Sequence, residues 1–132
     1  MKVLFVCSGN AFRSPLAEAL LKKSRPDLIV DSAGTNVETM ISAEARRFLA
    51  RQNAVQYLKK TPESLDTKRL TEYDVIIAME HTHESIILQK CPACHEKIIV
   101  WNIEDLGLKP YEFIEQIDKQ IEEKVSKLAK NL

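Results

Sequence analysis

Short apolar runs alternate with segments of helical periodicity along the whole chain, and this alternation restricts the fold more than any other feature. The apolar runs lie at residues 2–6, 28–31, 74–79 and 97–101. They are continuous rather than alternating with polar residues, which is typical of strands that are buried on both faces. Strands of this kind, separated by helices, form a parallel sheet covered on both sides. We therefore predict a three-layer α/β fold with four parallel strands and helices on both faces.

Helical signals fill the intervals between these strands. Ser14 and Pro15 supply a capping hydroxyl and a proline at the first helical position. Ser42 can cap a second helix, and residues 80–90 form a third. The last twenty or so residues repeat apolar positions at helical spacing, which predicts a long amphipathic helix docked on the sheet. Residues 53–71 are expected to form loop and short turns.

Length and composition fit a single globular domain that spans residues 1–132. Nineteen basic side chains balance nineteen acidic ones, so no net charge attracts nucleic acid or an anionic membrane. The apolar runs are too short to span a bilayer, and the first one is too short for a signal peptide. We therefore expect a cytoplasmic monomer that binds neither nucleic acid nor membranes, with its three cysteines in a reducing compartment.

The loop between the first strand and the first helix carries the unusual residues, Cys7-Ser8-Gly9-Asn10-Ala11-Phe12-Arg13-Ser14. Ligands of open α/β sheets bind beyond the carboxyl ends of the strands, where this loop is expected to lie. Gly9 and Asn10 tolerate positive φ, so the chain can curl with its N–H groups pointing inward as an anion-binding nest. The following helix adds N-terminal donors, and Arg13 supplies a planar fork for two oxygens of a tetrahedral anion.

A cysteine at the centre of such a ring is suited to nucleophilic attack. Helix N-termini and adjacent cations favour the ionised thiol, and the Ser14 hydroxyl can donate a hydrogen bond to the sulfur. Cys7 would then lie directly below a bound phosphate, in line for attack. The alternative is a buried cysteine at a strand end with a surface arginine. The cysteine–arginine spacing is weak evidence by itself, but the surrounding glycine, asparagine, serine and proline favour the phosphate site.

The segment Val6–Pro15 resembles the signature loop of the low-molecular-weight protein tyrosine phosphatases, whose fold is shared with thioredoxin-coupled arsenate reductases. Residues 32–35 and 74–79 extend the resemblance along the chain. It implies the flavodoxin-like strand order 2-1-3-4, Cys7 as nucleophile, no cofactor or metal, and a phosphotyrosine protein or small aryl phosphate as substrate. Many members have a second cysteine where this chain has Phe12, so a protective disulfide within the loop is excluded. The phosphate-binding residues that the resemblance implies are Ser8, Gly9, Asn10, Ala11, Phe12, Arg13 and Ser14.

The resemblance also implies an aspartate that protonates the leaving oxygen and then activates water. The family carries this residue, usually before a proline, on the loop after the fourth strand. That strand is expected to end at Trp101, and Asp105 aligns best with the general acid. Leu106 stands where proline is usual, so Glu104 is a competing candidate. The remaining alternative is an exposed acidic pair without a catalytic role.

Two further cysteines lie in the segment Cys91-Pro92-Ala93-Cys94-His95, which has three interpretations. The pair could relay oxidation from Cys7, as in an arsenate reductase, or it could form half of a zinc site. A zinc site would need further ligands, and no second pair of cysteines is present. We favour a helix end and turn whose thiols can form a disulfide without serving turnover.

Taken together, these residues predict a phosphomonoester hydrolase, and we expect a protein tyrosine phosphatase that forms a phosphocysteine at Cys7. The alternative is a thioredoxin-coupled arsenate reductase that uses Cys7 with Cys91 and Cys94, and a non-catalytic anion-binding or flavin-phosphate-binding module is less favoured. The phosphate site is better supported than the tyrosine preference. Residues 36–40, where the family has a substrate-facing loop, contain no aromatic side chain, and Trp101 is expected in the core.

Overall fold

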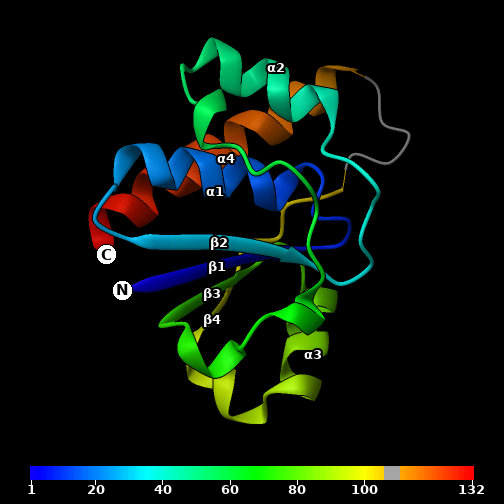
Figure 1. Ribbon diagram of the computed structural model, residues 1–132, viewed down its shortest axis with the longest axis vertical. Coiled ribbons are helices and arrows are strands. Elements are labelled where there is room, and N and C mark those ends of the chain that lie inside the picture. The colour runs from blue at the N-terminus through cyan, green and yellow to red at the C-terminus, as the bar shows by residue number, and fades with distance from the viewer. Residues whose placement is uncertain (106–110) are drawn as a thin grey trace.

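The computed structural model describes residues 1–105 and 111–132, with one parallel sheet at its centre. Neighbouring strands follow the order β2-β1-β3-β4, which confirms the predicted order 2-1-3-4. Helices α1, α2 and α4 lie on one face of the sheet and α3 lies on the other (Figure 1), so the three-layer prediction is also confirmed. The strands are β1 (Lys2–Cys7), β2 (Ile29–Gly34), β3 (Val75–Ala78) and β4 (Ile98–Val100). The helices are α1 (Arg13–Ser24), α2 (Ala43–Arg51), α3 (His81–Lys90) and α4 (Tyr111–Asn131).

The central strand β1 contributes to two separate cores. Val3 and Phe5 face the cluster that includes α1, α2 and α4, whereas Leu4 and Val6 face the cluster that includes α3. All four side chains are fully buried. Trp101 packs against Phe5 with ring centroids 5.5 Å apart, so it lies in the core as predicted. Burial on both faces fixes β1 firmly, and Cys7 stands at its carboxyl end.

Two predicted boundaries are wrong for physical reasons that concern the site. Strand β2 does not end at Asp31 but pairs with β1 as far as Gly34, because the buried Ser32 hydroxyl finds hydrogen-bond partners inside the protein. Helix α1 begins at Arg13 rather than after a Ser14 cap, and Phe12 occupies the N-cap position without a side-chain hydrogen bond.

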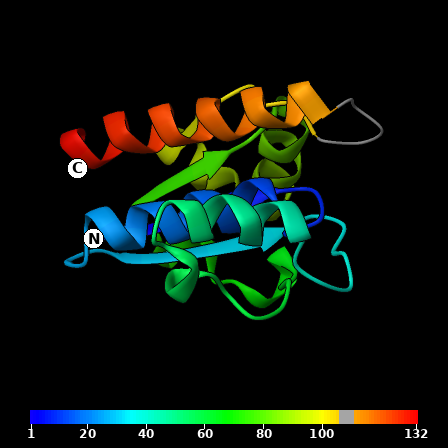
Figure 2. The same ribbon diagram turned by 90° about the horizontal axis from the view of Figure 1, so that it is seen from above.

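The irregular segment after α2 folds back beside the sheet. As predicted, it consists of loop and short turns, with 3-10 turns at Val55–Tyr57, Leu65–Thr67 and Leu70–Glu72. The loops that follow β1 and β2 lie together at one edge of the sheet (Figures 1 and 2). Within the described residues no helix has both the length and the apolar character needed to cross a membrane.

Candidate active site

Hydrogen-bond donors surround the sulfur of Cys7 at the start of the loop. Its thiol is 2% exposed and is not part of a disulfide. The main-chain N–H of Asn10 donates to Sγ at 3.3 Å, and Oγ of Ser14 lies 2.9 Å from Sγ. Asn10 has a φ of 53°, so the predicted left-handed turn occurs at this residue. Both contacts are aimed at the sulfur, so the loop holds this atom in a fixed position at the end of β1.

The two glycines near the loop allow close packing rather than unusual dihedral angles. A Cβ at Gly9 would lie 2.5 Å from the Glu38 side chain, so glycine lets residues 35–42 lie against the loop. A Cβ at Gly34 would lie 2.5 Å from the Ser8 carbonyl oxygen and 2.9 Å from the Asn10 nitrogen. Gly9 tolerates positive φ but does not adopt the left-handed conformation here, and its role is to leave space.

Asn10 is fully buried and fixes the direction of the Ser14 hydroxyl. Its Nδ2 donates to Oγ of Ser14 at 2.8 Å and to Oγ of Ser32 at 2.9 Å. Its Oδ1 accepts from Nζ of Lys59 and from the main-chain N–H of Glu63, each at 2.8 Å. A Cys7 thiolate can only accept, so in that state the Ser14 hydroxyl, which accepts from Asn10, donates its own hydrogen to Cys7 Sγ. The Ser14 side chain, which was predicted to cap a helix, therefore forms a hydrogen bond with the Cys7 sulfur instead.

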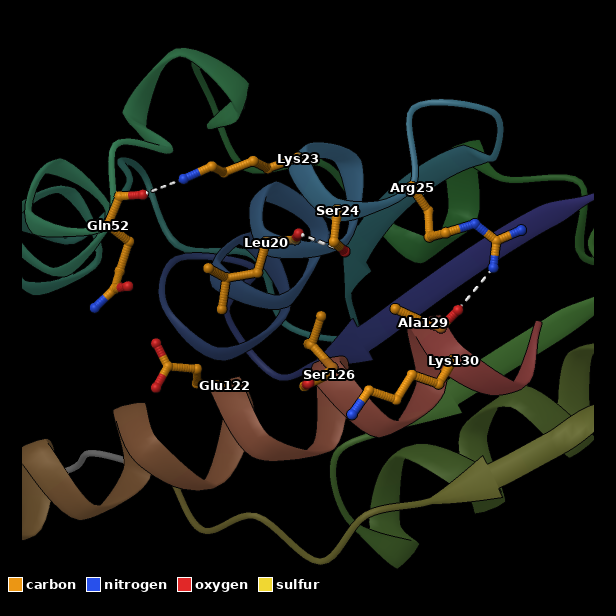
Figure 3. Close-up of a pocket in the computed structure, with 10 residues that line it drawn as sticks. Leu20, Lys23, Ser24, Arg25, Gln52, Glu122, Ser126, Ala129 and Lys130 are labelled. Atoms are coloured by element: carbon orange, nitrogen blue, oxygen red, sulfur yellow. Dashed lines mark hydrogen bonds between the residues drawn. The ribbon is translucent and has the colours of Figure 1, made fainter.

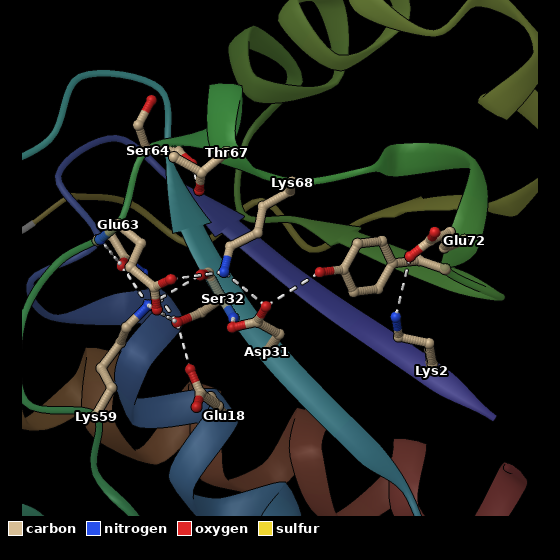
Figure 4. Close-up of polar contacts among 12 residues, drawn as sticks. Lys2, Glu18, Asp31, Ser32, Lys59, Glu63, Ser64, Thr67, Lys68 and Glu72 are labelled. Atoms are coloured by element: carbon tan, nitrogen blue, oxygen red, sulfur yellow. Dashed lines mark hydrogen bonds and ion pairs between the residues drawn. The ribbon is translucent and has the colours of Figure 1, made fainter.

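A partly buried network of charged and polar groups holds this support in place (Figure 4). Lys59 donates to the Ser32 carbonyl oxygen at 2.9 Å and pairs with Glu63 at 2.8 Å. Ser32 in turn donates its hydroxyl to Glu18 at 2.5 Å. Burial is the largest single influence on Asp31 nearby and disfavours its ionisation, but the hydrogen bonds from Lys68, Ser32 and Tyr73 and the charge of Lys68 together outweigh it and lower the pKa of that carboxyl. The network ties the phosphate loop to the irregular segment that follows α2.

Arg13 is held from several sides and is only 2% exposed. One guanidinium nitrogen donates to Glu80 at 3.0 Å and to the Ile103 carbonyl oxygen at 2.7 Å. The other lies 3.5 Å from Oγ of Ser8 and 3.7 Å from a carboxylate oxygen of Asp105. These contacts exclude the alternative of a surface arginine. Glu80 was not predicted as a site residue, although its position directly after the third apolar run places it at the same edge of the sheet.

A cavity of about 610 Å³ opens above Cys7 and Arg13. Most residues of the predicted phosphate loop line this cavity. Asn10 and Ser14 do not line it, because both are fully buried behind the loop. Phe12 contributes to the wall while only 5% exposed. The remaining lining residues are Asn36, Glu38, Met40, Ser42 and Asp105.

The structure separates the two candidate acids. Asp105 lines the cavity of Cys7, and its side chain is 62% exposed. Glu104 lines a different, smaller cavity beside α4, with Phe113 and Gln116. Leu106, which stands in place of the family's usual proline, lies outside the described residues. Geometry therefore favours Asp105 over Glu104.

Cys91 and Cys94 form a disulfide between the end of α3 and the turn that follows. Both are buried in the core on the α3 face, and neither lines the cavity of Cys7. This agrees with the predicted helix end whose thiols can form a disulfide. Among the described residues no group of three or more histidine, cysteine or acidic side chains is arranged to hold a metal ion.

A second cavity, of about 500 Å³, lies between α1, the end of α2 and α4 (Figure 3). Two of its three basic side chains are engaged: Lys23 donates to the Gln52 carbonyl oxygen at 2.5 Å, and Arg25 donates to the Ala129 carbonyl oxygen at 2.7 Å. It contains neither Cys7 nor any other residue of the phosphate loop. The chemistry of the chain is therefore concentrated at the first cavity.

The fold and the site together define an α/β protein with a cysteine–arginine anion loop at the carboxyl end of its central strand. The chain belongs to the low molecular weight phosphotyrosine protein phosphatase family, which it matches over residues 2–132. The resemblance of the Val6–Pro15 loop is thereby confirmed, and so is the prediction of a phosphatase.

Known relatives span most of the chain. The low molecular weight protein-tyrosine-phosphatase Wzb of Salmonella typhi is 32% identical over 114 residues, which cover 83% of this chain and 76% of that protein. The structure of Vibrio vulnificus Wzb in complex with benzylphosphonate has a TM-score of 0.86 and 28% identity, covering 99% of this chain and 98% of the other. The YwlE arginine phosphatase, in a cysteine-to-serine mutant with a phosphorylated active-site serine, has a TM-score of 0.87 and 25% identity, covering 100% and 95%.

Proposed function

We propose that this chain hydrolyses phosphotyrosine esters through a phosphocysteine intermediate at Cys7. The observation that carries the proposal is the pair of donors aimed at the Cys7 sulfur, from Asn10 at 3.3 Å and from Ser14 at 2.9 Å. A thiolate stabilised in this way is both a good nucleophile and a good leaving group. One guanidinium nitrogen of Arg13 is held by Glu80 and the Ile103 carbonyl oxygen, which leaves the N–H groups of its other nitrogens to donate to the phosphate oxygens.

The reaction takes two displacements at phosphorus. In the first, the Cys7 thiolate forms a sulfur–phosphorus bond while the bond from phosphorus to the tyrosyl oxygen breaks. Asp105 donates a proton to the departing oxygen, which is consistent with its place in the cavity of Cys7. In the second, the Asp105 carboxylate takes a proton from water, the hydroxide attacks phosphorus, and the thiolate leaves with its electron pair. Arg13 holds the phosphoryl oxygens in both steps.

Phosphoarginine is a second candidate substrate, supported by one relative and by the cavity wall. The relative is the YwlE arginine phosphatase. The described lining of the cavity carries two carboxylates, from Glu38 and Asp105, and one aromatic side chain, that of Phe12. Carboxylates suit the cationic guanidinium of a leaving arginine, whereas a tyrosine ring gains more from apolar walls.

A comparison of matched peptides tests the choice. One peptide carries phosphotyrosine and the other phosphoarginine at the same position, and kcat/KM is measured for both, with the Cys7→Ala variant as the inactive control. We expect the phosphotyrosine peptide to be the better substrate by tenfold or more, about 1.4 kcal/mol of transition-state stabilisation. A tenfold preference for phosphoarginine would replace the proposed substrate. Arsenate reduction with thioredoxin, assayed alongside, tests the remaining alternative.

We further propose that residues 1–132 act as one domain, and that this domain is a cytoplasmic monomer that needs no cofactor. The family match over residues 2–132 and the single four-stranded sheet support one domain. A reducing compartment would keep Cys7 as the free thiol that the mechanism requires.

A further inference from the structure

A buried histidine contacts the phosphate loop from the N-terminus of α3. His83 is 1% exposed, and its two ring nitrogens have different partners. The main-chain N–H of Glu80 donates to Nδ1 at 3.0 Å, and Nε2 lies 2.9 Å from Oγ of Ser8. Because Nδ1 accepts a hydrogen bond, the hydrogen of the neutral ring is on Nε2. His83 therefore donates to the Ser8 hydroxyl oxygen.

The surroundings of His83 keep it in this neutral form. Burial lowers its pKa, and the nearby positive charge of Arg13 lowers it further, against the opposing influence of Glu80 and Asp105. A second proton on Nδ1 would also face the Glu80 N–H, so it would break the capping interaction that starts α3. The direction of the His83–Ser8 hydrogen bond is therefore fixed at neutral pH.

The direction of this bond determines what Ser8 can do. Its Oγ accepts from His83, and a guanidinium nitrogen of Arg13 lies 3.5 Å away as a second donor. With donors on both lone pairs, the hydroxyl hydrogen has to point elsewhere, and Ser8 lines the cavity above Cys7. We propose that His83 is a positioning residue, which turns the Ser8 hydroxyl so that it donates to an anion bound over Cys7. This inference rests on the proposed phosphate site.

The proposal predicts that His83 and Ser8 act as one unit. Binding of inorganic phosphate is measured by calorimetry at pH 7 for the wild type, Ser8→Ala, His83→Leu and the double variant. We expect each single variant to bind phosphate about tenfold more weakly, because a donor to a charged group is lost. The double variant should bind no more weakly than Ser8→Ala. Independent, additive losses, or single variants that bind like the wild type, would overturn the proposal.

Conservative variants separate positioning from a merely structural role. A glutamine at position 83 can accept from the Glu80 N–H and still donate to Ser8, so His83→Gln should restore phosphate affinity to within about threefold of wild type. His83→Glu keeps the acceptor for the Glu80 N–H but offers no donor, and it should bind as weakly as His83→Leu. Equal affinity of the glutamine and glutamate variants would contradict the proposal, even if His83→Leu fails to fold.

The matched control is another histidine in the same helical turn. His81 is exposed and contacts Glu84 rather than the phosphate loop, so His81→Leu should leave phosphate affinity unchanged. The calorimetry also separates this inference from the proposed function. A wild type that does not bind phosphate would overturn both. A wild type that binds, with Ser8 and His83 variants that bind equally well, would overturn the positioning role alone.

Discussion

Asp118 is a buried carboxyl group on α4 whose ionisation should weaken the fold. Its side chain is 3% exposed, and within the described part of the chain its Oδ1 has no hydrogen-bond partner. Burial raises the pKa of Asp118 to about 6. Arg51 opposes the rise, whereas Glu115 and Glu122 on the same helix add to it. The surroundings of Asp118 therefore stabilise the protonated carboxyl group relative to the carboxylate.

The size of the effect follows from the two pKa values of this group. In the unfolded chain the pKa is near 3.8, so the folded protein binds the proton more tightly between pH 4 and pH 6. Stability therefore falls as the pH rises through this window, and the full cost is present above about pH 6. The difference between the two values corresponds to about 3 kcal/mol. Solvent screening near the helix surface reduces it to about 2 kcal/mol.

The substitution Asp118→Asn removes the ionisation while keeping the size of the side chain. We expect the free energy of unfolding to rise by about 2 kcal/mol at pH 8 and to stay close to the wild-type value at pH 4. Urea unfolding followed by Trp101 fluorescence, at intervals between pH 4 and pH 8, measures this difference. The exposed Glu123 on the same helix is not among the charges that shift the pKa of Asp118, and it provides the control, since Glu123→Gln should change stability by less than about 0.5 kcal/mol. Parallel pH profiles for Asp118→Asn and the wild type would refute the reasoning.

Three further predictions concern catalysis. Asp105→Asn should lower kcat/KM for phenyl phosphate by about 10²–10⁴-fold and much less for p-nitrophenyl phosphate, whose leaving group barely needs a proton. Glu104→Gln should leave kcat/KM for both esters near the wild-type value. If Asp105→Asn lowers kcat/KM for both esters by the same small factor, Asp105 is not the general acid. Arg13→Lys should lower kcat/KM by about 100-fold or more, because one ammonium cannot replace a fork held by fixed partners; near-normal kcat/KM would contradict the loop geometry. Cys91→Ser and Cys94→Ser, singly or together, should leave aryl phosphate kinetics under reducing conditions within about twofold, because neither residue lines the cavity. A tenfold loss of phosphatase rate would show that they shape the site, and a selective loss of arsenate reduction would favour the redox interpretation.

The sheet could be predicted because its strands are continuous apolar runs with local signals. The end of β2 could not be predicted, because Ser32 and Gly34 are residue types typical of turns. Ser32 is buried in a strand only because Glu18 and Asn10 reach its hydroxyl from other segments. The start of α1 was misplaced for a similar reason, since the Ser14 hydroxyl contacts Cys7 instead of a helix N-terminus. In both cases a tertiary hydrogen bond overrides a local preference.

The site was predictable where its residues are contiguous. Cys7 and Arg13 lie in one short loop, and the residues between them reveal its curvature. Lys59, Glu80 and His83 were not assigned to the site, because they come from distant segments that only the folded chain brings to the loop. For Glu80 and His83 the missed signal was their place just after a buried strand, at the edge where such sheets bind ligands. Lys59 has no comparable signal in the sequence.

The central claim is that Cys7 carries the phosphoryl group during turnover. Rapid acid quench of the enzyme during hydrolysis of p-nitrophenyl phosphate, followed by mass spectrometry of its peptides, measures this directly. We expect phosphate on the peptide that contains Cys7 in the wild type, and neither phosphate on that peptide nor hydrolysis in the Cys7→Ala variant. Continued hydrolysis by Cys7→Ala, or phosphate on any other residue of the wild type, would contradict the account.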